Sequence, residues 1–382
     1  MAAGAEKLKL RILFVSAADW AFRAHRLSLA KWLIQQGATV GVICPEGNER
    51  AILEAAGLEV YTMGWSREWV SLLETLRAAR EIRRVATAFG ADVVHCVSVR
   101  CVLLGWVANW GGRSWRVIHH VIGMGSLFSE KPKGLKTAGL RAGVEWALKR
   151  AFRANGTVTV FQNQDDELFW RERAGLGEAQ CVCLPGSIEW KEMTASEPQT
   201  DRVRILFVGR MLEDKGVREL FAAWQQVCSR GAEVELILCG DVDAGNPRSL
   251  SREELENMAE EKGCVWLGRV ENVLEEMTAA HLVVLPSYRE GLPRVILEAG
   301  LAARAVITTD VPGCREIVEH GKSGWLVPPR DVAALAESIE ILRDYVVQRT
   351  DLGAGLRERV KQKFSDAVVH PRWGDLYQRA DA

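Results

Sequence analysis

Long hydrophobic runs are missing from this sequence. Of its 382 residues 48% are hydrophobic and 26% are charged, yet no apolar stretch approaches the roughly 18–20 residues that a membrane-spanning helix needs. Near the N-terminus the apolar residues are only ILFV over 12–15, and Asp19 follows soon after. We therefore predict a first β-strand there and not a signal peptide. The length and composition are typical of a globular protein with two domains.

Metal and dinucleotide motifs are also missing. The nine cysteines are scattered, and the closest pair, Cys181 and Cys183, is too tightly spaced for a CxxC motif. This distribution indicates reduced thiols in a cytosolic protein. The seven histidines form no HExxH motif, so the sequence gives no support to a catalytic metal. Gly123 and Gly125 lack the third glycine of a dinucleotide fingerprint, so NAD binding is not expected.

The net charge of −1 conceals an uneven distribution. Residues 1–190 hold 24 Lys/Arg and 18 Asp/Glu, whereas residues 191–382 hold 25 and 32. Seven basic residues and a single acid, Glu145, lie within 131–153. Such a local cluster favours an anionic partner. No basic stripe alternates with stacking aromatic residues, so we do not expect a nucleic-acid partner.

Strand and helix patterns alternate along the chain, which predicts parallel sheets with helices on both faces. A polar stretch with Pro and Ser interrupts the alternation, and a second alternating series follows it. We expect an N-terminal domain over residues 1–187, a linker over 188–200, a C-terminal domain over 201–365, and a helix over 366–382 that can cross back to the N-terminal domain. Strands are expected over 10–16, 39–45, 92–98, 116–123, 156–163, 202–209, 235–241, 265–268, 281–287 and 305–310, and helices over 25–36 and 68–89.

Polar residues follow several of the expected strands in the second half. Arg210 and Lys215 flank a turn that comes directly after one strand and opens a helix. Cations and free backbone N–H groups at a helix N-terminus bind phosphate, although solvated surface charges are the alternative. Asp241 and Asp243 imitate a DxD metal motif, but the turn-forming residues after them favour a polar turn.

Two glutamates lie in the stretch YREGLPRVILEAG, over 288–300. Pro293 suits the first turn of a helix, which places Glu290 in a loop and Glu298 in the second helical turn. Eight helical residues would separate two carboxylates by about 12 Å, further than the roughly 5–9.5 Å of a glycosidase pair. We therefore predict that both glutamates bind an extended polyhydroxylated ligand, with the turn at Gly291 holding a phosphate between them.

Taken in order, the motifs GR-x4-KG, LGxV, PSxxEGxPxxxLEA and PGCREIVEHGKSGWLVPP resemble glycosyltransferase family 4. The resemblance covers nearly all of the second half. It implies a GT-B fold, an α/β architecture in which two Rossmann-like doubly wound domains face a central cleft. The first half, through VSAADWAFRAHRLSLAKWL and HHVIGMGSLF, is similar to bacterial transferases that act on undecaprenyl-diphosphate-linked glycans, such as N-acetylgalactosaminyltransferases of the bacterial N-glycan pathway.

The resemblance implies a role for each matching residue of the second half. Arg210 and Lys215 match the cations on the donor diphosphate, Glu290 the carboxylate facing the donor sugar, and Glu298 the carboxylate on the ribose hydroxyls. Backbone contacts to the donor are implied for Gly209, Gly291 and Leu292, and contacts to the base for Arg269 and Val270. The family transfers sugar with retention and without a clear enzymic nucleophile, so no metal or other cofactor is expected besides the UDP-sugar substrate.

In the first half the resemblance implies an acceptor site. His25 and Arg26, expected at the start of the first helix, suit the acceptor diphosphate, together with Gly123, Gly125 and Ser126 of the glycine loop. Many relatives carry a polar residue immediately before that loop, where this chain has Ile122. His120 is the catalytic candidate instead, beside His119. Either histidine reaches the sugar or is an ordinary strand residue, and the sequence leaves both interpretations open.

The basic segment 131–153 combines its charges with an apolar stripe and two aromatic residues. The stripe consists of Leu140, Val144, Leu148 and Ala151, and the aromatic residues are Trp146 and Phe152. Such a helix suits an anionic membrane surface, although a core-packed helix with a solvated basic face is the alternative. The expected location is cytoplasmic, on the inner face of the cell membrane.

These features predict a retaining transferase that moves a sugar, most simply an N-acetylhexosamine, from a UDP-sugar to an undecaprenyl-diphosphate-linked saccharide. Two alternatives stay open. One is a nucleotide-sugar 2-epimerase or phosphorylase of GT-B architecture, and the other is a non-catalytic subunit that binds a nucleotide sugar.

Overall fold

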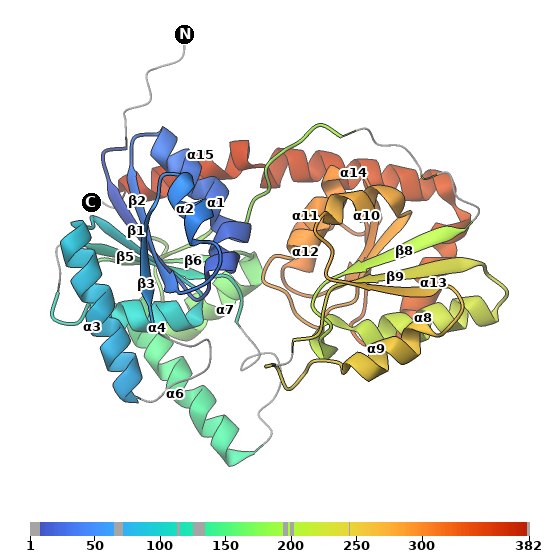
Figure 1. The fold of residues 1–382 in the computed structure, drawn as a ribbon, viewed down its shortest axis with the longest axis horizontal. Coiled ribbons are helices and arrows are strands. Elements are labelled where there is room, and N and C mark those ends of the chain that lie inside the picture. Colours follow the sequence, from blue (N-terminus) through green and yellow to red (C-terminus); the bar gives the residue numbers. More distant parts are fainter. Residues whose placement is uncertain are drawn as a thin grey trace, which may run out of the picture. The chain divides into compact units, whose positions relative to one another are not determined.

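A computed structural model describes residues 8–64, 72–112, 115–124, 134–193, 198, 202–243 and 245–379. The chain divides into two compact units (Figure 1). Unit 1 consists of residues 1–187 and 366–382, and unit 2 of residues 188–365. These boundaries coincide with the domain ends expected at 187 and 365. Ile188, expected to open the linker, is buried in the hydrophobic core of unit 2.

Unit 1 contains a seven-stranded sheet in which every pairing is parallel, with the strand order β3-β2-β1-β4-β5-β6-β7. Its strands are β1 (Arg11–Ser16), β2 (Thr39–Pro45), β3 (Glu59–Met63), β4 (Val93–Val97), β5 (Arg116–Val121), β6 (Thr157–Phe161) and β7 (Cys181–Cys183). The central strands β4 and β5 are buried except at Arg116, because helices cover both faces of a parallel sheet.

The helices of unit 1 include one that returns from the far end of the sequence. They are α1 (Asp19–Gln35), α2 (Arg50–Ala55), α3 (Leu72–Phe89), α4 (Val99–Ala108), α6 (Leu135–Phe152), α7 (Gln164–Ala174) and α15 (Asp366–Arg379). Helix α1 begins at Asp19 and not at His25 as expected. Three side chains of α15, those of Val369, Trp373 and Tyr377, are buried in the core beneath α1 and β1.

Unit 2 contains a six-stranded parallel sheet with the order β10-β9-β8-β11-β12-β13. Its strands are β8 (Val203–Val208), β9 (Val234–Cys239), β10 (Cys264–Gly268), β11 (Leu282–Leu285), β12 (Ala305–Thr309) and β13 (Trp325–Val327). Its helices are α8 (Val217–Ser229), α9 (Arg252–Ala259), α10 (Val273–Ala279), α11 (Arg294–Leu301), α12 (Cys314–Ile317), α13 (Val332–Asp344) and α14 (Val346–Phe364), with a short 3-10 turn, η1 (Glu213–Lys215), before α8.

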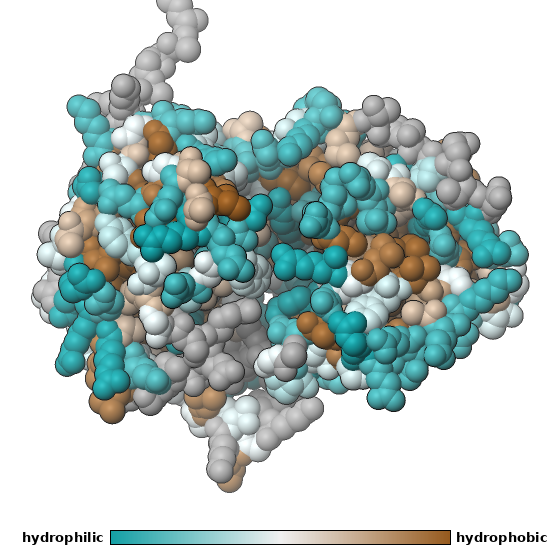
Figure 2. All heavy atoms as spheres, in the orientation of Figure 1, coloured by the Kyte–Doolittle hydropathy of each residue, from teal (hydrophilic) through white to brown (hydrophobic). Residues whose placement is uncertain are grey.

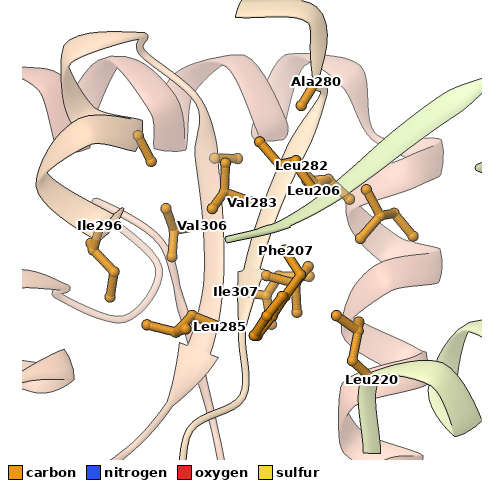
Figure 3. Packing of buried hydrophobic residues seen from close by; sticks show 14 of the residues in the cluster. Leu206, Phe207, Leu220, Ala280, Leu282, Val283, Leu285, Ile296, Val306 and Ile307 are labelled. Atoms are coloured by element: carbon orange, nitrogen blue, oxygen red, sulfur yellow. The ribbon is translucent and has the colours of Figure 1, made fainter. Parts of the chain in front are cut away.

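The core of unit 2 lies on both sides of its central strands. In Figure 3, Leu220 of α8 and Ile296 of α11 approach the strands from opposite sides. The strand residues between them, among them Phe207, Val283 and Ile307, are completely buried. Each such side chain contributes about 1.5–3 kcal/mol when it leaves water. The packed sheet is therefore a rigid base for the loops at its edges.

Candidate functional site

The strand order of unit 2 reverses between β8 and β11, which are neighbours in the sheet. Lys215 and Glu290, in the loops that follow these strands, are 75 residues apart in the sequence. In open parallel sheets, ligands bind outside the carboxyl ends of the strands at such a switch point. The loop over 209–216 follows β8, and the loop over 286–293 follows β11. The topology therefore brings together the two segments that carry Arg210, Lys215 and Glu290.

Lys215 and Glu290 meet directly at this switch point. The Nζ atom of Lys215 lies 2.5 Å from Oε1 of Glu290, and the hydroxyl of Ser287 donates to the same oxygen at 2.7 Å. The two side chains are only 21% and 10% exposed. An ion pair so far withdrawn from water is screened less than a surface pair, so each charge holds the other in place.

Two glycines allow the loops around this pair to approach closely. Gly216 has φ +72°, and a Cβ atom there would lie 2.2 Å from the carbonyl oxygen of Pro286. Gly313 has φ +79°, and its Cβ would lie 2.5 Å from the carbonyl oxygen of Gly291. Only glycine combines this backbone conformation with such contacts. The loops after β8, β11 and β12 are consequently packed backbone to backbone around Glu290.

Glu298 lies in the second turn of α11, as predicted, since the helix begins at Arg294. Arg294 donates from Nε to Oε1 of Glu298 at 2.8 Å. Burial raises the pKa of the Glu298 carboxyl above its ordinary value, and the neighbouring Arg294 opposes that rise. A half-buried carboxylate with a hydrogen-bonded cation is a suitable acceptor for hydroxyl donors of a ligand.

Arg210 is also paired with a carboxylate. Its guanidinium Nη1 lies 2.6 Å from Oδ2 of Asp243. Asp241, two residues earlier, contacts Arg252 at 3.3 Å, and the guanidinium of Arg252 lies over the ring of Trp266. The two aspartates that imitate a DxD motif thus bind separate arginines.

The remaining predicted donor-binding residues line the same edge of the sheet. Gly209 follows β8 and donates its N–H to the carbonyl of Cys239 at 2.9 Å. Leu292 and Val270 are half-buried against the core, whereas Arg269 is exposed directly after β10. Gly291 lies in the loop before α11, beneath Gly313. Their contacts with a donor stay a prediction.

In unit 1 the catalytic candidate His120 belongs to a buried polar chain. Arg26 Nη2 lies 3.2 Å from His120 Nε2, His120 Nδ1 lies 3.1 Å from His95 Nε2, and His95 Nδ1 lies 2.6 Å from the hydroxyl of Tyr377. Trp373 packs against both imidazole rings. His120 has no exposed surface, so in this conformation it acts on its protein neighbours and does not reach a sugar directly.

Arg26 determines which group donates and which accepts in each hydrogen bond of this series of buried side chains. A guanidinium can only donate, so His120 accepts at Nε2 and carries its proton at Nδ1. His120 then donates to His95, which carries its own proton at Nδ1 and donates to Tyr377. Burial, with the nearby Arg26 charge, holds the pKa of His95 and of His120 well below the ordinary value. Both imidazoles are therefore neutral at pH 7, as the single proton on each requires.

The prediction that Arg26 lies at the start of a helix is wrong, because α1 begins seven residues earlier than Arg26, at Asp19. Arg26 is buried, and burial lowers its pKa to about 10. Among the described residues its hydrogen-bond partners are the carbonyl of His25, the ring of His120 and the amide oxygen of Gln162, with no carboxylate. His25 itself is exposed.

The glycine loop that follows β5 is described only in part. Gly123 is half-buried, while Gly125 and Ser126 lie outside the described residues. His119, the alternative to His120, is completely buried beside Phe152, and burial lowers its pKa to about 3. Both histidines are thus strand residues of the core.

The basic helix α6 uses its predicted apolar stripe mainly within the core. Val144, Leu148, Ala151 and Phe152 are buried against the sheet. Leu135, Leu140 and Trp146 are exposed, and the guanidinium of Arg150 lies 5.6 Å from the Trp146 ring. The free end of α6 accordingly carries apolar surface in Figure 2. Along the described residues no helix is long and apolar enough to cross a membrane.

The sequence did not single out every residue of these two clusters. Ser287 and Arg294 flank the predicted Glu290 and Glu298, and their positions directly after β11 and at the first turn of α11 could have identified them. His95 and Tyr377 carried no signal, because their contact with His120 depends on the return of α15 to unit 1.

Two protein families match the chain. Residues 202–344 match the family described as Glycosyl transferases group 1, and residues 23–209 match the family described as Glycosyl transferase 4-like domain. The chain is 25% identical over 386 aligned positions to the N,N'-diacetylbacillosaminyl-diphospho-undecaprenol alpha-1,3-N-acetylgalactosaminyltransferase of Campylobacter jejuni, covering 97% of this chain and 99% of that protein. It is 30% identical over 177 residues to the capsular polysaccharide biosynthesis glycosyltransferase CapM of Staphylococcus aureus, covering 46% of each.

Solved structures show the same fold. A sucrose-phosphate synthase from Thermosynechococcus elongatus superposes with a TM-score of 0.80 at 19% identity and covers 97% of this chain and 99% of that one. The Anabaena protein HepE, solved with UDP and glucose, superposes with a TM-score of 0.78 at 18% identity and covers 97% of this chain and 100% of that one. Together with the two parallel sheets, these likenesses identify the GT-B fold.

Proposed function

Since the chain belongs to the group 1 glycosyltransferases with a 4-like N-terminal domain, we propose that it transfers an N-acetylhexosamine with retention from a UDP-sugar to an undecaprenyl-diphosphate-linked saccharide. The observation that carries this proposal is the Lys215–Glu290 pair at the switch point of unit 2. The acceptor class is supported by the similarity along almost the whole chain to the Campylobacter enzyme, whose name specifies such an acceptor. HepE, solved with UDP and glucose, supports the donor class.

In this proposal the donor lies along the carboxyl edge of the unit 2 sheet. Arg210 and Lys215 bind the diphosphate as charge-assisted donors, and Glu298, fixed by Arg294, accepts from the ribose hydroxyls. Glu290 accepts from hydroxyls of the sugar. The backbone of Gly209, Gly291 and Leu292 lines the donor, and Arg269 and Val270 contact the base.

Transfer breaks the bond between the anomeric carbon and the diphosphate oxygen. The acceptor hydroxyl oxygen forms the new bond on the same face of the sugar, and its proton passes to the departing phosphate. Negative charge develops on that phosphate, where Lys215 and Arg210 stabilise it. Glu290 already accepts hydrogen bonds from Lys215 and Ser287, which suits a carboxylate that orients the sugar and does not attack it. The proposed mechanism needs no metal.

The acceptor is assigned to unit 1. Arg26 is a buried cation with no carboxylate partner among the described residues, so it makes the region around it positive without being neutralised. That positive potential favours binding of the acceptor diphosphate. We assign His25, Gly123, Gly125 and Ser126 to the same acceptor-binding site. His120 positions Arg26. The exposed Leu135, Leu140 and Trp146 of α6, beside its basic residues, attach the enzyme to the inner, anionic surface of the cell membrane.

The test is a transfer assay with the full chain. UDP-GalNAc, UDP-GlcNAc and UDP-glucose are each offered with undecaprenyl-diphosphate-linked saccharides, and the anomeric configuration of the product is read by NMR. We expect one UDP-N-acetylhexosamine to be transferred with retention. An inverted product would contradict the retaining mechanism, and absence of both transfer and UDP binding would contradict the proposal as a whole.

The same assay separates the alternatives. A 2-epimerase or phosphorylase would convert the nucleotide sugar or a soluble glycan without any lipid acceptor, which product analysis without acceptor would reveal. A non-catalytic binding subunit would bind UDP and transfer nothing.

A further inference from the structure

Arg210, assigned above to the donor diphosphate, is occupied in this structure by a carboxylate of its own chain. Its Nη1 lies 2.6 Å from Oδ2 of Asp243. The Arg210 side chain is 50% exposed and that of Asp243 is 26% exposed. An exposed ion pair contributes only about 0–1 kcal/mol to stability, so the fold does not depend on this contact.

The backbone nevertheless fixes the two residues opposite each other. The segment 210–213 is joined to the segments 241–243 and 245–250 by two hydrogen bonds. Met211 N–H donates to the Asp241 carbonyl at 3.2 Å, and Leu250 N–H donates to the Met211 carbonyl at 2.8 Å. Leu212 and Ser249 form an antiparallel bridge between the same segments. The position of Asp243 beside Arg210 is therefore built into the loops.

Ser249 fixes Asp243 itself. Its hydroxyl accepts the N–H of Asp243 at 2.9 Å and lies 3.3 Å from the carbonyl of Met211, the residue next to Arg210. The carbonyl of Asp243 in turn accepts from the N–H of Asn246 at 2.7 Å. These bonds fix the main chain of Asp243, so its carboxylate starts from a position beside the guanidinium while its side chain can still turn away.

We propose that Asp243 competes with the diphosphate of the nucleotide for Arg210. Carboxylate and phosphate oxygens bind a guanidinium in the same way, through paired N–H donors. The nucleotide competes with Asp243 for Nη1 of Arg210 and must displace the carboxylate to form paired hydrogen bonds through that nitrogen. Asp243 pairs with Arg210 again when UDP leaves. Asp243 thereby weakens the binding of the UDP product and speeds its release. This inference rests on the proposed function.

Asp241 provides a matched control within the same loop. It carries the same charge, and it contacts Arg252 and not Arg210. Replacing either aspartate by asparagine removes one negative charge from the loop, but only Asp243→Asn frees Arg210. A difference between the two variants therefore reports the contact with Arg210 and not the charge of the loop.

The experiment is calorimetric titration of the full chain with UDP. We expect Asp243→Asn to lower the Kd of UDP about three- to fivefold, which corresponds to the upper end of the roughly 0–1 kcal/mol of an exposed ion pair. If product release limits turnover, the tighter binding of UDP should also lower kcat. Asp241→Asn should leave the Kd within about twofold of wild type. Equal Kd values for wild type and Asp243→Asn would overturn the inference while leaving UDP binding, and so the proposed function, intact.

A double-mutant cycle with Arg210→Gln tests whether Asp243 changes the affinity for UDP through its contact with Arg210. If Asp243 acts through Arg210, Asp243→Asn changes the Kd of UDP less than twofold in the Arg210→Gln background. The same gain in both backgrounds would mean that Asp243 merely repels anions, and would overturn the inference. If wild type binds no UDP at all, the inference and the proposed function fall together.

Discussion

Lys215 and Glu290 are 75 residues apart in the sequence, and their side chains form one hydrogen-bonded ion pair at the point where the strand order of unit 2 reverses. The pair therefore exists only when β8 and β11 are adjacent in the folded sheet. Substitutions at this pair should change turnover more than they change folding.

The Glu290→Gln substitution tests the carboxylate while keeping its shape. Loss of the charge releases Lys215 and weakens the hold on the sugar, so kcat should fall about 100- to 1,000-fold, as when one preorganised group of a catalytic site is removed. Glu319→Gln is the matched control, since Glu319 also binds a lysine, Lys322, at 2.5 Å but in an exposed pair. Steady-state kinetics with a saturating acceptor would measure both. A Glu290→Gln enzyme within fivefold of wild type would contradict the assigned role.

The Gly216→Ala substitution tests the close approach of the two loops. A Cβ at this position would meet the Pro286 carbonyl oxygen at 2.2 Å, with φ at +72°. We expect kcat/KM to fall at least tenfold, because the loop that carries Lys215 must move away from the loop that carries Glu290.

Gly231→Ala separates this effect from backbone strain. Gly231 has φ +86° but nothing within 4 Å of an added Cβ. Both variants should lose about 1–2 kcal/mol of stability through the left-handed conformation, measured by thermal unfolding. Gly216→Ala should lose more because of its contact with Pro286, and only Gly216→Ala should lose activity. Equal activities in the two variants would argue against a role for the loop contact.

The buried histidines of unit 1 predict a loss of stability in mild acid. The pKa values of His95 and His120 lie well below the ordinary value, and that of His119 is about 3. Because the unfolded chain takes up protons near pH 6.5 and the folded chain does not, their contribution is complete above pH 6.5 and is lost as the pH falls toward 3. Each histidine should lower the free energy of unfolding by about 1.4 kcal/mol per pH unit in that range.

Urea unfolding at pH 7.5, 6 and 5 would measure this dependence. His119→Gln should make the slope of stability against pH shallower by about one proton, whereas substitution of the exposed His25 by Gln should leave it unchanged. If the wild-type protein is equally stable at pH 7.5 and 5, the buried histidines are not neutral in the folded state.

The exposed face of α6 predicts binding to anionic vesicles. Arg141→Glu combined with Arg150→Glu should weaken binding to vesicles that contain an anionic lipid at least 30-fold, since each cation near such a surface contributes about 1 kcal/mol. A charge reversal of the same size in unit 2, Arg202→Glu with Arg230→Glu, should have little effect. Sedimentation with vesicles would compare the variants. Equal binding by wild type and the α6 variant would contradict attachment through this helix.

Apolar runs were sufficient for the central strands of both sheets, because these strands are buried on two faces. It did not reveal β3, β7 or β13, which are short edge or near-edge strands with half-exposed residues. The start of α1 was also misplaced, since the segment DWAFRA before His25 carries no clear apolar repeat. Such elements form because hydrogen bonds and packing contacts with neighbouring strands and helices stabilise them, and these contacts are not visible in the local sequence.

The candidate site was predictable only as separate loops. Each of Lys215, Glu290 and Glu298 could be placed after a strand or inside a helix from the local sequence. Their pairing with one another, with Ser287 and with Arg294 depends on the strand order and on glycines that let the loops touch. Arg26 was expected at an open helix start and instead lies within α1, buried against His120, because a residue on the core side of a long helix is covered by the sheet.

The return of α15 to unit 1 gives the two units different requirements during synthesis. Unit 2 is continuous in sequence, so all of its strands have been made once residue 365 is added. Unit 1 begins at the N-terminus, yet its core lacks Val369, Trp373 and Tyr377 until the final helix is made. Domains made first ordinarily fold first on the ribosome. Here the first unit to be translated is the last whose core can be completed. The hydrogen bond between His95 and Tyr377 forms only after α15 has been made.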